Sequence, residues 1–302
     1  MDFNSLMVGV VSGVGTGAIY VLTATSFTLV LMASGVFNFA QGTIVMLGAV
    51  FAFVLGVSLH WPVLAVVACV IGGGTLLGLL THVVAIAPVM RRAVHVSEAA
   101  MITTLGLGLA GESLTQKIFG PDPQVVPSYV SSTPWNVAGI PVRPVYVVMV
   151  AVTLAVTLAL ETVMQRTQTG TVLRATLEDP VGAGLVGIDT TKVVAAVFAL
   201  AGALSALAGF LIAPVTFASP FLSANIALFA FAAMGVGGFG SFRGALVGGI
   251  AVGIIGGVVP VVLDSHATLP ILFAIVLAVL LVKPAGLFGV KGYFGNVKLR
   301  EI

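Results

Sequence analysis

Long runs of this chain carry no formally charged side chain. None of the residues between Asp2 and Arg91 is charged, and two further uncharged runs lie on either side of Arg243. A helix that crosses a bilayer needs about 20 consecutive apolar residues, so each run is long enough for one or more spans. Only 7% of the 302 residues are charged, whereas a soluble domain has about a quarter. The sequence therefore predicts an integral membrane protein.

Proline, glycine and charged residues divide the apolar sequence into segments of spanning length. They predict an all-α, polytopic bundle of about eight to nine spans in a single transmembrane domain, 1–302. The expected helices are 6–32, 36–57, 62–87, 98–119, 145–164, 193–213, 224–240, 244–263 and 267–282. The segment 120–144 contains six prolines. Each proline removes a backbone donor and clashes with the preceding turn, so this segment is expected to be an extramembrane loop.

The basic residues predict how the chain is oriented in the membrane. Ten of the twelve Lys and Arg residues fall in 88–97, 165–192, 240–243 and the tail 283–302. Basic residues gather on the cytoplasmic side of membrane proteins. We therefore expect these segments and the C-terminus to be cytoplasmic and 120–144 to be extracytoplasmic. The N-terminus is expected outside, unless the segment near residues 33–44 is re-entrant.

Composition and spacing argue against several other classes of protein. A net charge of +2 on scattered basic residues gives no nucleic-acid footprint. The four histidines are far apart, so no metal site is expected. The chain lacks a GxxxxGK[ST] phosphate loop and shows no nucleophile and base pair, so we do not expect an enzyme. Cys69 lies in an apolar run and is expected to be a small core residue. The glycine-rich runs are expected to allow close helix packing.

A polar, glycine-bearing interruption at 35–43 separates two apolar runs and contains Asn38 and Gln41. Backbone that leaves a helix at membrane depth is tolerated only where protein or a watery cavity satisfies its polar groups. A broken helix facing the solute is therefore one interpretation. The alternative is a tight turn between two ordinary spans, with Asn38 as the N-cap of the second.

The loop 165–192 is expected to contain two short helices. Asp179 before Pro180 is typical of an N-cap followed by the first helical residue, and Gly187 is typical of a helix terminator. Apolar residues in this loop would be poorly covered and could dock into a groove on a partner; they are Val172, Leu173, Leu177, Leu185 and Val186. The alternative is that the helices fold back on their own bundle.

Glu112 is an acid embedded in the apolar segment 98–119. Carboxylates inside the membrane are costly unless they face protein or water, and they often mark a transport path. At about 1.5 Å per residue, Glu112 lies roughly 12 Å from Gly120, a depth that suits an outward-facing cavity. The alternative is a structural acid that reaches the interface or pairs with Lys117.

Four motifs resemble, in the same order, those of the permease family of branched-chain amino acid ABC importers (LivH/LivM type). Residues 38–42 look like its Asn-Phe-Ala-His-Gly element, and 170–188 like its cytoplasmic signature. Residues 237–245 resemble its glycine-rich stretch, and 284–289 its terminal Pro-x-Gly-Leu-x-Gly. Two positions depart from the pattern. Gln41 stands where the family commonly has histidine, and Glu112 where it often has glutamine.

The resemblance implies a membrane assembly with several partners. It implies a second permease, identical or homologous, two cytoplasmic ABC ATPases and an extracytoplasmic solute-binding protein, in a bacterial plasma (inner) membrane. ATP and Mg²⁺ would be used by the ATPases, and this chain would hold no cofactor. The resemblance further implies that the cytoplasmic loop couples ATP hydrolysis to transport through Arg174, Glu178, Asp179 and Gly187.

The expected function is translocation of a small polar organic solute by alternating access. The solute expected first is a branched-chain or hydrophobic amino acid, and urea, short amides and small organic acids are the alternative solutes within the family. We expect the path to be lined partly by Thr25, Thr28, Asn38, Gln41 and Glu112. A secondary transporter driven by an ion gradient is the alternative of another class, with Glu112 as its proton or cation site.

Overall fold

The computed structural model describes residues 3–93, 95–137 and 139–289. Apart from one two-stranded hairpin, the regular structure in these ranges is helical, and the elements follow one another as α1 (Phe3–Ser34), α2 (Gln41–Phe53), α3 (Val63–Thr81), α4 (Ala87–Arg92), α5 (Val96–Phe119), β1 (Trp135–Val137), β2 (Ile140–Val142), α6 (Pro144–Arg166), α7 (Gln168–Glu178), α8 (Pro180–Leu185), α9 (Thr190–Thr216), α10 (Leu222–Gly237), α11 (Phe242–Val262) and α12 (Thr268–Val282). Two π-helical turns, Val54–Ser58 and His82–Ile86, extend α2 and join α3 to α4.

Seven helices in the described residues are long and apolar enough to cross a membrane. Two others complete the predicted set of nine: α10 is apolar but shorter, and α5 has spanning length but is not among the seven. The prediction of a polytopic helical membrane bundle is confirmed. The predicted helix 36–57 is wrong at its start, because residues 35–40 are non-helical and α2 begins at Gln41.

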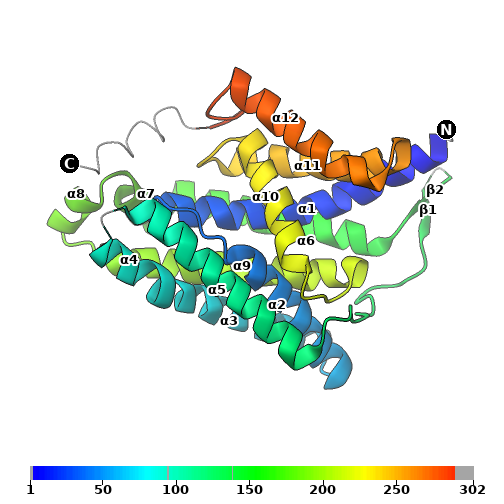
Figure 1. Ribbon diagram of the computed structural model, residues 1–302, viewed down its shortest axis with the longest axis horizontal. Helices are drawn as coiled ribbons and strands as arrows, with labels where there is room; N and C mark the ends of the chain where they lie inside the picture. The colour runs from blue at the N-terminus through cyan, green and yellow to red at the C-terminus, as the bar shows by residue number, and fades with distance from the viewer. Residues whose placement is uncertain (1–2, 94, 138, 290–302) are drawn as a thin grey trace.

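The segments expected to lie outside the membrane are at opposite ends of an elongated bundle (Figure 1). The β1–β2 hairpin and the start of α1 are at one end, whereas α7 and α8 are at the other. The expected loop at 120–144 is non-helical up to the start of α6 and contains this antiparallel hairpin, in which Trp135 pairs with Val142. The expected loop at 165–192 does contain two short helices, α7 and α8. Of the expected tail 283–302, residues 290–302 lie outside the described residues.

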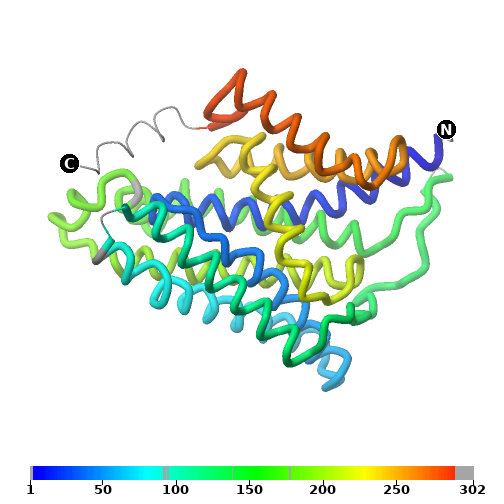
Figure 2. Tube along the Cα trace, in the orientation of Figure 1, coloured from blue at the N-terminus to red at the C-terminus, as the bar shows by residue number. Residues whose placement is uncertain are grey.

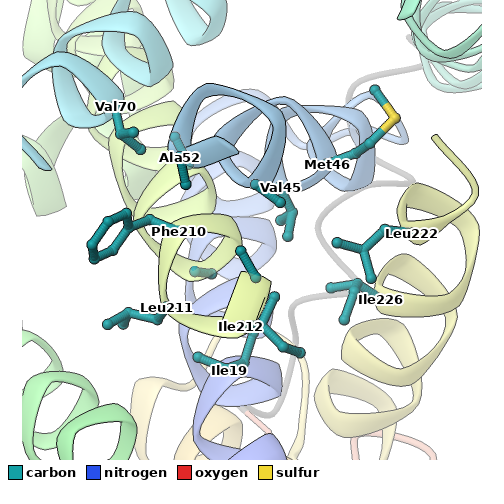
Figure 3. Packing of buried hydrophobic residues seen from close by; sticks show 14 of the residues in the cluster. Ile19, Val45, Met46, Ala52, Val70, Phe210, Leu211, Ile212, Leu222 and Ile226 are labelled. Carbon is teal, nitrogen blue, oxygen red and sulfur yellow. The ribbon is translucent and has the colours of Figure 1, made fainter. Parts of the chain in front are cut away.

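The largest buried cluster brings together α1, α2, α9 and α10 (Figure 3). Ile19, Met46 and Ile212 are fully buried in it, and Ile226 joins them from α10. The hydrophobic effect does not drive helices together in the hydrocarbon core of a membrane, because lipid tails are as apolar as the side chains. These contacts therefore stabilise the bundle mainly through close van der Waals packing.

Glycines set the distance between α1 and α11, as the glycine-rich runs predict. Gly9, Gly13 and Gly17 of α1 face the α11 backbone. A Cβ atom at Gly13 would lie 2.6 Å from the carbonyl oxygen of Gly253, closer than real Cβ atoms approach. Small residues allow helices to approach this closely in a membrane. The two helices therefore form a tight seam through the bundle.

The expectation that Cys69 is a core residue is wrong, because its side chain is exposed on α3. The same helix also exposes Leu76 and Leu80. A spanning helix can be hydrophobic all round because lipid covers the faces that protein does not. An apolar run in such a chain therefore does not distinguish a buried position from a lipid-facing one.

Candidate functional site: a polar junction of α2, α5 and α10

Figure 2 follows the chain trace from α1 into α2, and Asn38 lies in the break between these two helices. Its Oδ1 accepts a hydrogen bond from the Ala40 N–H at 3.1 Å, and its Nδ2 donates to Gln41 Oε1 at 2.9 Å. The N-cap position of α2 is Ala40, whose methyl group cannot cap a helix. The expectation of Asn38 as the N-cap is thus wrong in position, although its side chain does bond the backbone at the start of α2.

Asn38 and Gln41 are each only 1% exposed, so the interruption is buried in protein. Asn38 fixes the oxygen end of the Gln41 amide. The nitrogen end, Nε2, is buried and has no hydrogen-bond partner among the described residues. A buried donor without a partner is uncommon in native proteins and calls for an explanation.

Helix α5 packs along this break with a face of small and polar residues. Thr104 Oγ1 accepts from the Phe39 N–H at 3.2 Å, and Thr43 Oγ1 donates to the Gly108 carbonyl at 3.2 Å. A Cβ atom at Gly111 would lie 2.8 Å from the Thr43 methyl group. The four-residue spacing of Thr104, Gly108 and Glu112 places all three on one face of the helix.

Glu112 continues that face of α5 and reaches the start of α10. Its Oε2 accepts a hydrogen bond from Ser223 Oγ at 2.7 Å, and its Oε1 lies 3.5 Å from Gln116 Nε2. Ser223 is the second residue of α10, and the N-terminus of a helix favours a carboxylate. The expected alternative of an ion pair with Lys117 is not found in the described residues, where the two ion pairs join other residues.

The starts of α2 and α10 also touch directly. A Cβ atom at Gly42 would lie 2.5 Å from the Ser223 carbonyl oxygen and 2.8 Å from the Ala227 methyl group. Three of the predicted path residues, Asn38, Gln41 and Glu112, therefore belong to one polar junction of α2, α5 and α10. Ser223 was not predicted. A lone serine in an apolar run gives no signal before its neighbours in space are known.

Thr25 and Thr28 lie on α1 and are fully buried. Neither hydroxyl has a hydrogen-bond partner among the described residues, so neither bonds to the junction. Other helical threonines behave differently, because Thr23 donates to the carbonyl of Ile19 four residues earlier. The role of Thr25 and Thr28 in a path stays a prediction.

The predicted coupling residues lie in and around α7 and α8. Asp179 caps α8, accepting from the N–H groups of Val181 and Gly182 at 3.1 and 3.0 Å. The predicted N-cap is confirmed. Gly187 has φ +88°, the left-handed conformation expected of a terminator. Arg174 and Glu178 are exposed, as is Asp179.

The apolar residues of this loop divide into two groups. On α7, Val172 and Leu173 are partly buried, and Leu173 packs against the core of its own bundle. On and after α8, Leu185 and Val186 are 84% and 77% exposed. The expectation that these apolar side chains are exposed is therefore confirmed for Leu185 and Val186 and is wrong for Val172 and Leu173. The side chain of Leu177 lies outside what the structure describes.

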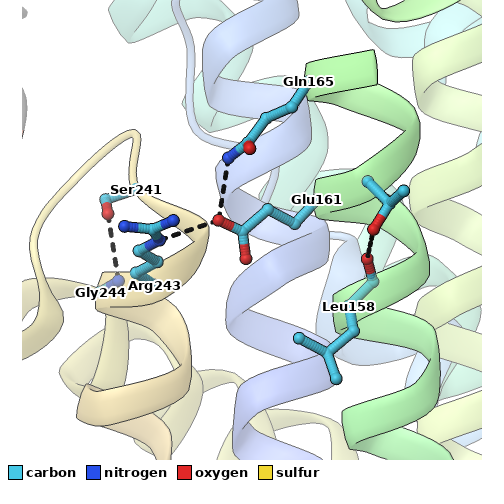
Figure 4. Close-up of polar contacts among 7 residues, drawn as sticks. Leu158, Glu161, Gln165, Ser241, Arg243 and Gly244 are labelled. Atoms are coloured by element: carbon cyan, nitrogen blue, oxygen red, sulfur yellow. Dashed lines mark hydrogen bonds and ion pairs between the residues drawn. The ribbon is translucent and has the colours of Figure 1, made fainter. Parts of the chain in front are cut away.

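An ion pair that the sequence did not predict joins α6 to α11 at the end of the bundle near α7 (Figure 4). Arg243 Nε donates to Glu161 Oε1 at 2.8 Å, and Gln165 Nε2 donates to the same oxygen at 2.9 Å. The two charged residues are 82 positions apart in sequence, and no local pattern links them.

A cavity of about 390 Å³ lies apart from the junction, between the π-turn 82–86 and the start of α9. His82 and Lys192 line it. Lys192 Nζ lies 3.0 Å from Asp189 Oδ2, and the hydrogen bond from the Lys192 side chain lowers the pKa of the Asp189 carboxyl. The charge of Lys192 is therefore already balanced, and the cavity is a weaker candidate for a charged solute than the junction.

A family model described as "Branched-chain amino acid transport system / permease component" matches residues 9–283. The chain belongs to this family. It is 29% identical over 294 residues to the high-affinity branched-chain amino acid transport system permease protein LivH of Escherichia coli, covering 92% of this chain and 94% of that protein. It is 31% identical over 291 residues to a probable LivH of Methanocaldococcus jannaschii, covering 89% and 88%.

A third permease relative is BraD of Pseudomonas aeruginosa, 27% identical over 293 residues and covering 92% of this chain and 94% of that protein. No solved structure matches the chain significantly. The family match spans every helix from α2 to α12, so the polar junction of this permease lies within it. The predicted family is confirmed.

Proposed function

We propose that this permease is one of two membrane subunits of an ATP-driven importer in a bacterial plasma (inner) membrane, and that its solute is a branched-chain or other hydrophobic amino acid. The support is the family membership together with relatives named as branched-chain amino acid transport permeases. The other partners are two cytoplasmic ABC ATPases, which use the ATP and Mg²⁺, and an extracytoplasmic solute-binding protein.

The observation that carries the coupling part of this proposal is the surface of α8. Val181, Leu185 and Val186 are 75%, 84% and 77% exposed, at the end of the bundle opposite the hairpin. Exposed apolar residues on a short helix suit docking into a groove on a partner. The ATPases would occupy this end, which makes α7, α8 and the C-terminus cytoplasmic and puts the N-terminus outside.

Movement of the docked loop would reach the membrane helices as a rigid-body shift. One residue, Thr167, separates α6 from α7, and its Oγ1 accepts from the Gly170 N–H at 3.1 Å. Leu173 packs α7 onto the bundle core. A shift of α7 would therefore displace α6 rather than be absorbed in a slack loop.

The solute would pass the junction of α2, α5 and α10, where Asn38, Gln41 and Glu112 lie. In an alternating-access cycle the helices separate and close again around the solute. Thr25 and Thr28 would line the path only when α1 parts from its neighbours, and their unpaired hydroxyls would then find polar partners.

Uptake of leucine into proteoliposomes tests the proposal. The vesicles contain this permease, its partner permease and the ATPases, and the solute-binding protein is added on one side with ATP on the other. We expect leucine uptake to require ATP and to persist with an uncoupler. Uptake that stops with the uncoupler while ATP is held constant would indicate an ion-coupled transporter instead.

Arg174→Glu tests the coupling loop. Arg174 is an exposed cation of the proposed docking surface. Reversing its charge would remove its electrostatic complementarity with the ATPase, so we expect uptake to fall roughly tenfold or more. The permease should still enter the membrane, because Arg174 is exposed. Lys117→Glu is the matched control, because Lys117 is exposed near the opposite end of the bundle. Unchanged uptake by Arg174→Glu would reject the coupling role.

A further inference from the structure

Glu112 is half-buried although it lies well inside α5. It precedes the last helical residue, Phe119, by seven positions, roughly 10 Å along the axis. A carboxylate that is open on one side cannot face hydrocarbon at that depth without a large penalty. The open side of Glu112 therefore faces water or a partner chain, and the proposed path requires water.

The carboxylate of Glu112 is held in a fixed orientation. Ser223 is 5% exposed, and its hydroxyl donates to Glu112 Oε2 at 2.7 Å from the first turn of α10. Within the described residues Glu112 has no Lys, Arg or His partner within ion-pair distance. The carboxylate is thus oriented by a hydrogen bond but not paired with a basic side chain of the described residues.

Gln41 supplies the complementary group at the same junction. Its Oε1 is engaged by Asn38, so its buried Nε2 is the end left without a partner. The next residue, Gly42, contacts the backbone of Ser223, the residue that holds Glu112. The junction therefore combines an unneutralised carboxylate with an unpaired amide donor.

We propose that Glu112 is a specificity-determining residue that binds the ammonium group of an α-amino acid, while Gln41 Nε2 donates to its carboxylate. Ser223 is a positioning residue that acts through Glu112. This assignment rests on the proposed function, because it requires the solute to pass the junction. A zwitterion satisfies both groups. A neutral amide gains no ion pair, and an organic anion is repelled by Glu112.

Binding of labelled leucine to the solubilised permease–ATPase complex tests this assignment. The solute-binding protein is omitted, so its own specificity does not enter. Glu112→Gln should weaken leucine binding roughly tenfold to a hundredfold, the effect of losing one charge-assisted hydrogen bond. Glu112→Asp keeps the carboxylate and should lose less of the affinity for leucine than Glu112→Gln does. The leucine affinity of Ser223→Ala should lie between those of Glu112→Gln and the unmodified complex. Glu98→Gln, an exposed acid on the same helix, should bind normally.

Two competitors with the hydrocarbon chain of leucine separate the roles. Isopentylamine has the ammonium group alone and should compete with leucine in the unmodified complex but not in Glu112→Gln. Removing the negative charge should also allow 4-methylpentanoate, which has the carboxylate alone, to compete better. Gln41→Leu should lower the affinity for leucine but not for isopentylamine.

Equal leucine affinity in Glu112→Gln and the unmodified complex, both eluting intact, would overturn the assignment and leave the proposed function standing, because uptake by the unmodified importer is measured separately. Failure of that importer to take up any amino acid would overturn the proposed function itself. If Glu112→Gln does not assemble, isopentylamine competition is measured in Glu112→Asp and Ser223→Ala instead, and we expect it to be weaker in both than in the unmodified complex. Unchanged isopentylamine competition in both would overturn the assignment.

Discussion

One polar side chain in this permease replaces the N-cap that α2 lacks. Asn38 makes two hydrogen bonds across the break before α2, whose N-cap residue is an alanine. The donor and acceptor that it satisfies are buried with it. At this scale one side chain determines whether the backbone can leave the helix inside the protein.

Asn38→Ala should therefore lower stability. The change leaves the Ala40 N–H and Gln41 Oε1 unpaired, and each buried unpaired group costs about 1–3 kcal/mol. We expect a lower midpoint of thermal unfolding for the purified permease in detergent. Asn38→Asp should be less harmful than Asn38→Ala at acidic pH, where a protonated carboxyl can accept from the Ala40 N–H and donate its O–H to Gln41 Oε1. An unchanged midpoint in Asn38→Ala would show that the break does not depend on this side chain.

At the scale of whole helices, glycines allow the backbones of neighbouring helices to pack closely. The α1–α11 seam depends on backbone contacts that leave no room for a side chain, as at Gly13 against Gly253. Other glycines in spanning helices face open space, as Gly72 does on α3. Glycine content alone therefore does not identify an interface, and the contacts of each residue decide its role.

Gly13→Ala and Gly72→Ala form a matched pair that tests this difference. At Gly13 the added methyl group would clash with backbone that cannot rotate away, and overpacking of this kind typically costs about 1–3 kcal/mol. At Gly72 it meets nothing within 4 Å, and alanine stabilises a helix relative to glycine by up to about 1 kcal/mol. The midpoint temperature of thermal unfolding should fall for Gly13→Ala and should not fall for Gly72→Ala. The same decrease in both would contradict the seam.

The molecule as a whole has two dissimilar ends. One carries the hairpin with exposed Trp135 and Val137, and the other carries α8 with exposed Leu185. The uneven distribution of Lys and Arg predicts that the α8 end is cytoplasmic. The Arg243–Glu161 pair lies near this end and ties α11 to α6 just before α7.

Cysteine labelling tests this orientation. Cys69 is the single cysteine, so Cys69→Ser gives a background without thiols. In intact cells a membrane-impermeant maleimide should label Val137→Cys but not Leu185→Cys, and both should react after the cells are opened. Labelling of Leu185→Cys in intact cells would place α8 outside and refute the coupling proposal.

The sequence by itself determined the membrane class, the positions of the nine expected helices except for the start of α2, the caps of α8 and the family. These follow from hydropathy, proline positions and local capping chemistry, all of which act over short stretches of chain. Only the tertiary structure decided that Glu112 meets Ser223, that Glu161 pairs with Arg243 and that Cys69 is exposed. Each depends on which helix faces are neighbours. In lipid a helix can be apolar on every face, so the sequence pattern carries little information about which face packs against protein.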